Sequence, residues 1–341
     1  MPSVFPPGAR LGLRYRIARV VAHGPIAAVY EAHELESGEA VAFKWLHAPD
    51  DQHAALGRLA DRAREAQRLQ HPGLVQVRDV AREDDSLYVV SSWERGEPYS
   101  HLLAQQLMPL SQRLAVLAAA FAALEAGHDA GVAHGGLHPD NLYLGSRSGT
   151  AIKLLDLALN QTCCAAMFGA QQRVAAGHHV YMAPEQLAPH YTPNVRSDVF
   201  AAAVLTFQAL SARLPFIAPN AHALRAAHAH EPPRIDQLRA DVPRALATLL
   251  AACLAARPEQ RPTSVAELRV ALEKFAREVS PHAPPPTEAQ PLSMSVTQAQ
   301  ARGELIVTPR QERAPETAPE AETESVSQPI SFHGEQRARS R

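Results

Sequence analysis

The chain has 341 residues, a length that accommodates one large domain or two small ones. Apolar residues make up 46% of it, enough for a sizeable core, and the formal net charge of −2 gives no electrostatic signal for nucleic acid or an anionic membrane. The three cysteines, Cys163, Cys164 and Cys253, form no C-x-x-C pair, so we expect a reduced, cytoplasmic protein without a disulfide framework.

The N-terminus lacks a basic region followed by an apolar stretch, so no secretory signal is predicted. The longest apolar run, Leu114–Leu124, is too short to span a bilayer and is typical of a buried helix. We therefore expect no membrane segment.

After an N-terminal extension, residues 1–13, the chain is predicted to form a small, mostly antiparallel lobe over residues 14–95. A helical pattern over 52–70 places Leu56, Leu59, Ala63, Ala66 and Leu69 on one face, and His71-Pro72-Gly73 ends it. Alternation of apolar and polar side chains predicts the strands Tyr15–Ile17, Ala28–Ala32, Glu39–Lys44, Leu74–Val80 and Ser86–Ser91.

From Gly96 the pattern becomes helical, and a short hairpin, Leu142–Leu144 with Ile152–Leu155, interrupts it. A β-rich lobe followed by a helical lobe over residues 96–280 is an α+β arrangement, and ligands favour the cleft between two such units. Helical periodicity covers residues 100–107, 110–130, 184–188, 195–212, 220–228, 243–256 and 264–278.

Residues 281–341 are rich in Pro, Glu, Gln, Ser and Thr, with Phe332 as the only aromatic side chain. Such a segment buries too little apolar surface to offset its ordering entropy, so we predict a disordered tail. Thr308-Pro309 and residues 323–325 are candidate phosphorylation sites, and an unstructured soluble tail is the simpler interpretation.

Several motifs occur in an order that resembles the bacterial Ser/Thr protein kinase family over about residues 14–278. Val41–Lys44 reads V-A-F-K, His134–Asn141 reads H-G-G-L-H-P-D-N, and Asp156 follows on the next hairpin. The family's catalytic loop reads H-R-D-L-x-x-x-N. Ala183-Pro184-Glu185 and Arg261-Pro262 complete the order. The resemblance implies a two-lobed protein-kinase-like fold, with a small β-rich lobe carrying one helix and a larger, mainly helical lobe.

The resemblance also implies a cleft for ATP and Mg²⁺. Lys44 would bind the α- and β-phosphates, and Asn141 and Asp156 would hold the metal. The glycine-rich loop keeps only Gly24, so it would cover a nucleotide less closely. The other nucleotide contacts implied are Val29 after that loop, Ala42 above the adenine, and Ser92, Trp93 and Glu94 at the hinge.

In the family the lysine pairs with a glutamate on the helix of the small lobe. That position holds Arg62 here. Either Asp61 or Glu65 would reach Lys44 after a small shift of the helix, or the pair is missing.

Three positions that act together in the family depart from its pattern. Gly136 stands in the position of the catalytic aspartate, and a glycine has no side chain to accept a proton. His138 replaces the lysine that steadies the transferred phosphoryl group, and His178 replaces the threonine of the substrate-binding segment. Asp140 is a weak substitute for the base, and a protonated His138 would be a weak mimic of the lysine.

The resemblance assigns structural roles to three further residues. Glu185 and Arg261 would form an ion pair in the helical lobe. Asp198 would anchor the backbone of the catalytic loop.

Together these features predict a pseudokinase that binds ATP weakly or not at all and acts as a signalling regulator or scaffold for an unidentified protein partner. One alternative is an active but slow Ser/Thr protein kinase that transfers the ATP γ-phosphate to protein hydroxyls, because Lys44, Asn141 and Asp156 persist and the base matters least when the transition state is loose. Another is a nucleotide-independent interaction scaffold, which the altered glycine loop and the displaced helix acid favour.

Overall fold

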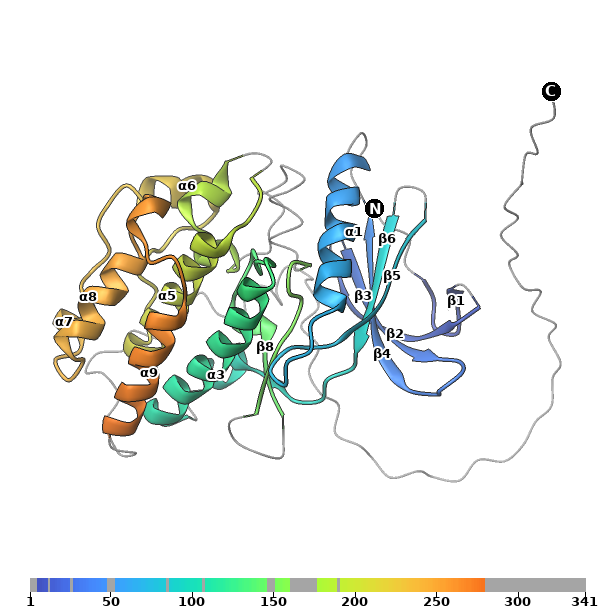
Figure 1. Cartoon of the computed structure of the whole chain (residues 1–341), viewed down its shortest axis with the longest axis horizontal. Coiled ribbons are helices and arrows are strands. Elements are labelled where there is room, and N and C mark those ends of the chain that lie inside the picture. Colours follow the sequence, from blue (N-terminus) through green and yellow to red (C-terminus); the bar gives the residue numbers. More distant parts are fainter. Residues whose placement is uncertain are drawn as a thin grey trace. The chain divides into compact units, whose positions relative to one another are not determined.

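The computed structural model describes residues 5–279 except 12, 25–26, 48–52, 84–85, 106–107, 146–150, 160–176 and 189–190. The predicted tail over 281–341 and the Cys163-Cys164 pair lie outside the described residues. The described chain forms a small lobe built on a curled sheet and a larger helical lobe, so the α+β prediction is confirmed (Figure 1).

The small lobe is a six-stranded antiparallel sheet of order β1-β2-β3-β4-β6-β5. Its register places Lys44 of β4 opposite Val29 of β3 and Val89 of β6. The strands are β1 (Arg10–Leu11), β2 (Tyr15–His23), β3 (Ala27–Glu34), β4 (Ala40–His47), β5 (Val77–Glu83) and β6 (Ser86–Ser92). A strand lies in each region expected from alternation, where alternate side chains such as Ala28, Tyr30 and Ala32 are buried. The strand expected over Leu74–Val80 begins later, at Val77.

The N-terminal residues belong to this sheet. β1 pairs with β2, and the ring of Phe5 lies edge-on to Trp45 with centroids 5.1 Å apart. The backbone N–H of Phe5 also donates to the hydroxyl of Tyr30. Part of the expected extension over residues 1–13 therefore packs on one face of the sheet.

Helix α1 (His53–Gln67) lies against the other part of the sheet and contacts β5 and β6 (Figure 1). Its buried side is apolar, with Leu56, Leu59, Ala63 and Ala66 all buried, as their spacing predicts. The other charged side chains of the helix, Asp61, Arg64 and Glu65 among them, are exposed, whereas Arg62 is partly buried.

The large lobe is organised around two buried helices. α3 (Leu110–Asp129) packs against α5 (Val195–Ser211) and α9 (Ala266–Glu278), and α5 is buried from Ser197 to its end. The side chain of Asn194 begins α5 by accepting hydrogen bonds from the N–H groups of Arg196 and Ser197. By length and composition α3 alone among the described helices would suffice to cross a membrane, but 56% of its apolar window is buried inside the lobe.

Shorter elements complete the large lobe. The segment predicted as a helix over 184–188 is a 3₁₀-helix, η4 (Pro184–Leu187). Pro184 begins it, the side chain of Gln186 accepts from the N–H of Ala183 at its start, and the extended backbone of Ala188 ends it after a single turn. The others are β7 (Glu97–Pro98), α2 (Tyr99–Ala104), η1 (Pro139–Asn141), β8 (Leu142–Leu144), β9 (Ile152–Leu154), η3 (His179–Tyr181), α6 (Ala221–Ala227), α7 (Ile235–Leu238), α8 (Arg244–Cys253) and η5 (Pro258–Gln260).

The two lobes meet at a hinge that only glycine allows. At Gly96 a Cβ atom would collide with the carbonyl oxygen of Leu144, because β7 pairs directly with β8 there. The hinge is thereby fixed to the hairpin β8–β9, which follows Asn141 and leads to Asp156.

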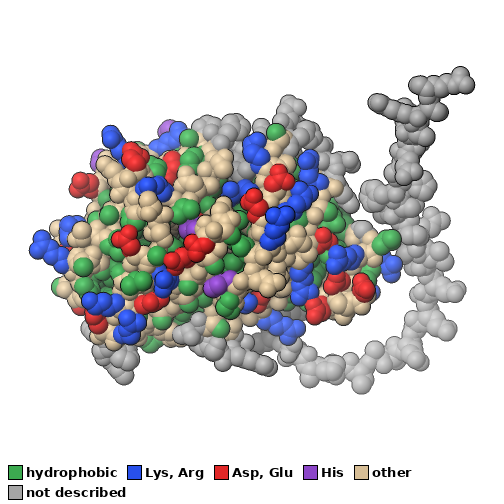
Figure 2. Space-filling model, viewed as in Figure 1, with side chains coloured by type: hydrophobic (Ala, Val, Ile, Leu, Met, Phe, Trp, Pro, Cys, Tyr) green, Lys and Arg blue, Asp and Glu red, His purple; other side chains and the backbone are tan. Residues whose placement is uncertain are grey.

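Charged side chains are interspersed on the face drawn in Figure 2, with no extended patch of one sign among the residues described there. The buried Cys253 is a free thiol, and burial raises its pKa to about 12. It therefore behaves as a small apolar side chain in the core.

Candidate functional site

The loop His134–Asn141 connects α3 to β8, and one buried carboxylate holds its beginning. Asp198 of α5 accepts hydrogen bonds from the backbone N–H groups of His134 and Gly135, each at 2.7 Å, and from the ring of His128 at 2.9 Å. Burial alone would raise the pKa of Asp198, but these hydrogen bonds outweigh it and lower the pKa. Asp198 is therefore an ionised clamp on the loop backbone.

Two further contacts fix the same loop. The ring Nε2 of the fully buried His134 lies 3.0 Å from the carbonyl oxygen of Leu155, and burial lowers the pKa of this imidazole. A neutral ring with its proton on Nε2 donates to that carbonyl. Gln186 donates to the carbonyl oxygen of Gly135 at 2.9 Å, a contact that the sequence patterns did not single out.

Asn141 and Asp156 lie at the end of this loop and at the end of β9. The amide nitrogen of Asn141 donates to the carbonyl oxygen of Gly136 at 3.1 Å, which leaves the amide oxygen as the atom for a cation among the described residues. Leu155 N–H donates to the Asn141 carbonyl, so the two segments are joined directly next to Asp156. An amide oxygen and a carboxylate are oxygen donors of the kind that Mg²⁺ prefers, so these residues fit that ion.

Lys44 reaches this pair of residues from the small lobe. It is 8% exposed, forms an ion pair with Asp156, and its Nζ donates to the carbonyl oxygen of Leu159 at 3.1 Å. Lys44 thus bridges β4 and the turn that follows β9. A cation at this place also fits the phosphates of a nucleotide.

The structure does not bring Lys44 to either acid considered on α1. The side chain of Asp61 is 72% exposed and pairs with Arg64, and Glu65 is exposed. Within the described part of the chain neither forms an ion pair with Lys44. The cause is the amphipathic pattern of the helix, which turns the buried Ala63 and Ala66 inward and both carboxylates outward.

Arg62 has a contact that the sequence did not indicate. Its guanidinium donates to the carbonyl oxygen of Ala133 at 2.7 Å, from α1 in the small lobe to the residue just before His134. The Nε of Arg62 is buried and has no hydrogen-bond partner in the described part of the chain. A positive charge therefore stands where the resemblance leads one to expect a glutamate.

The remaining nucleotide contacts implied by the sequence line the sheet and hinge. Gly24 N–H donates to Ala27 at 2.8 Å in the turn between β2 and β3, and Ala42 lies opposite Ser91 in the sheet. The N–H of Ser92 already donates to Gln76, and the guanidinium of Arg19 lies over the ring of Trp93.

A cavity of about 390 Å³ lies beside the hinge, and it is distinct from the predicted nucleotide cleft. Of the predicted nucleotide contacts only Glu94 lines it, together with His71, Tyr143 and Lys153. Lys44 and Asp156 take no part in it, so this cavity does not mark the nucleotide site.

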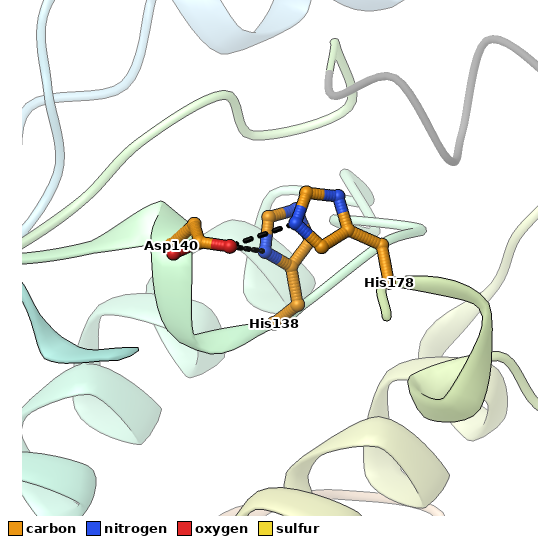
Figure 3. A group of neighbouring side chains, drawn as sticks. All are labelled: His138, Asp140 and His178. Carbon is orange, nitrogen blue, oxygen red and sulfur yellow. Dashed lines mark hydrogen bonds and ion pairs between the residues drawn. The ribbon is translucent and has the colours of Figure 1, made fainter. Parts of the chain in front are cut away.

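On the catalytic side, Gly136 is buried and offers only backbone atoms. The nearby carboxylate, Asp140, is engaged at both oxygens, by the hydroxyl of Ser100 and by Nε2 of His178 at 2.7 Å. His138 stacks on His178 with ring centroids 3.9 Å apart and ring planes 17° apart (Figure 3). The altered positions His138 and His178 are thus in direct contact.

The titration of this group argues against both weak substitutes. Burial and the neighbouring His178 lower the pKa of His138 well below its usual value, so it is neutral at physiological pH and does not mimic a lysine. Burial alone would raise the pKa of Asp140, but the hydrogen bonds from His178 and Ser100 help to outweigh it and lower the pKa. A carboxylate with both oxygens engaged is a poor proton acceptor.

Glu185 and Arg261 form a bidentate ion pair with N–O distances of 2.7 and 2.8 Å. Arg261 is 3% exposed and also donates to the carbonyl oxygens of Ala255, Ala256 and Arg196. A buried guanidinium with all these partners holds the segment after Ala183 to the last helices of the lobe.

Comparison with known proteins gives a consistent assignment. The family model of the protein kinase domain matches residues 15–273. The chain is 30% identical to the serine/threonine-protein kinase Pkn1 of Myxococcus xanthus over 90% of this chain and 46% of Pkn1. It is 32% identical to pkn2 of the same organism over 76% of this chain and 32% of that relative. The chain therefore spans less than half the length of these two curated relatives.

Solved structures agree on the fold. The kinase domain of Mycobacterium tuberculosis PknI aligns with a TM-score of 0.62 and 22% identity over 80% of this chain and all of that one. Rad53 residues 1–466, solved in complex with AMP-PNP, align with a TM-score of 0.58 and 21% identity over 77% of this chain and 65% of that one. At these identities the likeness concerns the fold alone.

Proposed function

Because the chain belongs to the protein kinase domain family, we propose that it is a pseudokinase, a member that transfers no phosphate, binds ATP weakly and regulates or scaffolds a signalling partner in the cytoplasm. Its relatives in the comparison are serine/threonine-protein kinases, so the proposal concerns what this chain has lost.

The absence of a side chain at Gly136 carries the proposal. In the family this position accepts the proton of the substrate hydroxyl. Of the described residues in the same loop, Asp140 is the carboxylate, and its two oxygens are taken by Ser100 and His178. Within the described part of this loop no carboxylate is therefore free to take the place of the missing aspartate.

The charges around the loop support the same conclusion. Phosphoryl transfer depends almost entirely on positioned charges that stabilise the transition state. His138 is neutral, and α1 presents Arg62 where an acid would orient Lys44. Losing several such groups together removes most of the rate acceleration.

The residues expected to bind the nucleotide support weak ATP binding. Lys44, Asn141 and Asp156 offer one cation and two oxygen ligands at the end of the cleft, a set that suits the phosphates and Mg²⁺ of ATP. When bound, the ion would neutralise phosphate charge. The chain's own residues would hold and orient the nucleotide, with Gly24 covering it less closely than a complete glycine-rich loop.

The test is phosphate transfer from radiolabelled ATP to the full chain itself and to a generic basic protein. The Asp156→Ala variant gives the background. We expect wild type and variant to be indistinguishable. Incorporation that the variant abolishes would overturn the proposal and establish the second candidate, a slow Ser/Thr kinase, which the retained Lys44–Asp156 pair favours.

A further inference from the structure

We propose that His138, Asp140 and His178 form a binding site for a zinc ion, which joins the catalytic loop to the segment that begins at Gly177. This site goes beyond the proposed function, because it uses none of the nucleotide ligands and does not depend on ATP.

The geometry of the three ligand atoms carries the proposal. One atom from each residue lies within 4.8 Å of the other two. Nε2 of His178 lies 2.7 Å and Nδ1 of His138 lies 3.8 Å from the same oxygen, Oδ2 of Asp140, and Figure 3 shows a nitrogen of each ring turned towards it. Ligand atoms around a tetrahedral Zn²⁺ are about 3.3 Å apart when each bond is about 2.0–2.1 Å long. The two measured separations lie on either side of this value, so shifts of about half an ångström would bring the atoms to it. Because an imidazole binds a metal through a lone pair in the plane of its ring, the two stacked rings must also turn out of their parallel arrangement to close the site.

An unpartnered buried nitrogen supports the same site. Nδ1 of His138 belongs to a side chain that is 5% exposed, and within the described part of the chain it has no hydrogen-bond partner. Burying such an atom without a partner costs free energy, and coordination to a metal ion would offset that cost.

Hydrogen bonds from neighbouring residues hold the three proposed ligands and the segments that carry them. The hydroxyl of Ser100 binds the second oxygen of Asp140, and the N–H of Asn141 donates to the carbonyl oxygen of His138. On the other side, His179 lies 2.8 Å from the carbonyl oxygen of Ala218, and Tyr181 donates to Gln208, which fixes the segment that carries His178. Such supports orient metal ligands before the metal arrives.

The donor set selects the ion. Two imidazole nitrogens and one carboxylate suit Zn²⁺, whereas Mg²⁺ and Ca²⁺ take oxygen ligands. The Asn141 and Asp156 oxygens are therefore the place for Mg²⁺, and the two ions would not compete. Three protein ligands leave a fourth position for water or for a side chain of a partner.

The experiment titrates chelator-treated, full-length protein with Zn²⁺ in competition with a chromophoric chelator, without nucleotide. We expect one zinc whose affinity falls at least about 100-fold in His178→Ala and in His138→Ala, since even a supporting residue is worth 10–100-fold. Ser100→Ala keeps all three ligands and is expected to weaken zinc by about 10–100-fold. The double variant His222→Ala, His230→Ala removes two exposed histidines and serves as the matched control.

Cobalt distinguishes this site from others on the chain. Co²⁺ bound at this site should give the visible absorption of a low-symmetry, four-coordinate ion, and His178→Ala should abolish it while far-ultraviolet circular dichroism without metal stays unchanged. Absence of zinc binding, or affinity that is equal in wild type, His178→Ala and Ser100→Ala, would overturn the proposal. Because nucleotide is absent throughout, either result leaves the test of phosphate transfer untouched.

Discussion

Lys44 forms its ion pair with Asp156, the residue suited to hold the metal of a nucleotide, and its ammonium also binds the carbonyl oxygen of Leu159. In this arrangement Lys44 neutralises the carboxylate that Mg²⁺ would bind. A nucleotide must therefore offer its phosphates to Lys44 before the carboxylate is free for the ion. Metal and nucleotide are expected to bind together or not at all.

Thermal unfolding tests this coupling. ATP with Mg²⁺ at about 100 times Kd should raise the unfolding free energy by ~2.7 kcal/mol. Mg²⁺ alone should give no shift, because Asp156 is already paired. Lys44→Met should abolish the shift, whereas Lys153→Met, at a half-exposed lysine near the hinge cavity, should retain it. No shift in wild type would favour a scaffold that binds no nucleotide, and equal shifts in both variants would show that ATP does not bind at Lys44.

Restoring the catalytic aspartate alone is expected to restore no activity. In Gly136→Asp the neutral His138 and its stacked partner His178 still stand where charge is needed. Groups that act as a unit are not additive, so the triple variant Gly136→Asp, His138→Lys, His178→Thr should transfer phosphate where the single one does not. Radiolabel incorporation measures this, with Asp156→Ala added to the triple variant as background. A single variant as active as the triple would show that the histidines are irrelevant.

His228 is predicted to make the protein less stable in acid. Its ring lies edge-on to the stacked rings of Phe200 and Phe216, and burial, with a smaller effect from Arg261, lowers its pKa from 6.5 to about 4. Because the unfolded chain binds this proton more tightly, the stability due to the neutral ring is complete above about pH 6.5 and is lost as pH falls towards 4. The pKa difference corresponds to about 3 kcal/mol.

His228→Leu should remove this dependence. Both ring nitrogens of His228 are buried without a hydrogen-bond partner in the described part of the chain, so an apolar side chain of similar size is expected to stabilise the fold already at pH 7. Denaturant unfolding at a series of pH values measures the difference, which should widen from pH 6.5 down to 4. A constant difference across this range would contradict the assignment.

Two alanines occupy left-handed backbone positions that glycine tolerates better. Ala212 ends α5 with φ +57°, and Ala158 follows Asp156 with φ +64°. Ala212→Gly should raise the unfolding free energy by about 1 kcal/mol. Ala158→Gly should gain less, because it also removes a fully buried methyl group. Ala209→Gly, inside the same helix, is the control and should destabilise by about 1 kcal/mol or more; denaturant midpoints with unchanged slope report all three.

The spacing of apolar residues predicted most of the helices and strands, because that spacing depends directly on which side chains are buried. α1 buries Leu56, Leu59 and Ala63 as their spacing requires, and the strands of the small lobe follow alternation. The elements that sequence missed are two-residue strands such as β1 and the four-residue α7, which are too short to carry a period. At η4 the helical segment stops after one turn, because the backbone becomes extended at Ala188.

The site was only partly predictable. The resemblance indicated that His138 and His178 belong to one group of positions, and their rings do stack. It led us to expect an acid of α1 beside Lys44 and a glutamate at the position of Arg62, so it did not indicate that Lys44 pairs with Asp156 or that Arg62 binds Ala133. Which of several nearby polar groups a long side chain reaches depends on the packing of the whole lobe, and no local pattern records it.

The hydrogen bond from Arg62 to Ala133 gives the small lobe a mechanical connection to the loop it covers. A partner protein that binds α1 and shifts it by the length of this one bond would displace Ala133. Ala133 directly precedes the two backbone N–H groups that donate to Asp198. To move α1 without the loop, the hydrogen bond from Arg62 would have to break, and its partly buried guanidinium would lose a partner. We therefore expect the helix and the loop to move together. The position of a loop that catalyses no reaction can in this way still depend on how far the two lobes have closed.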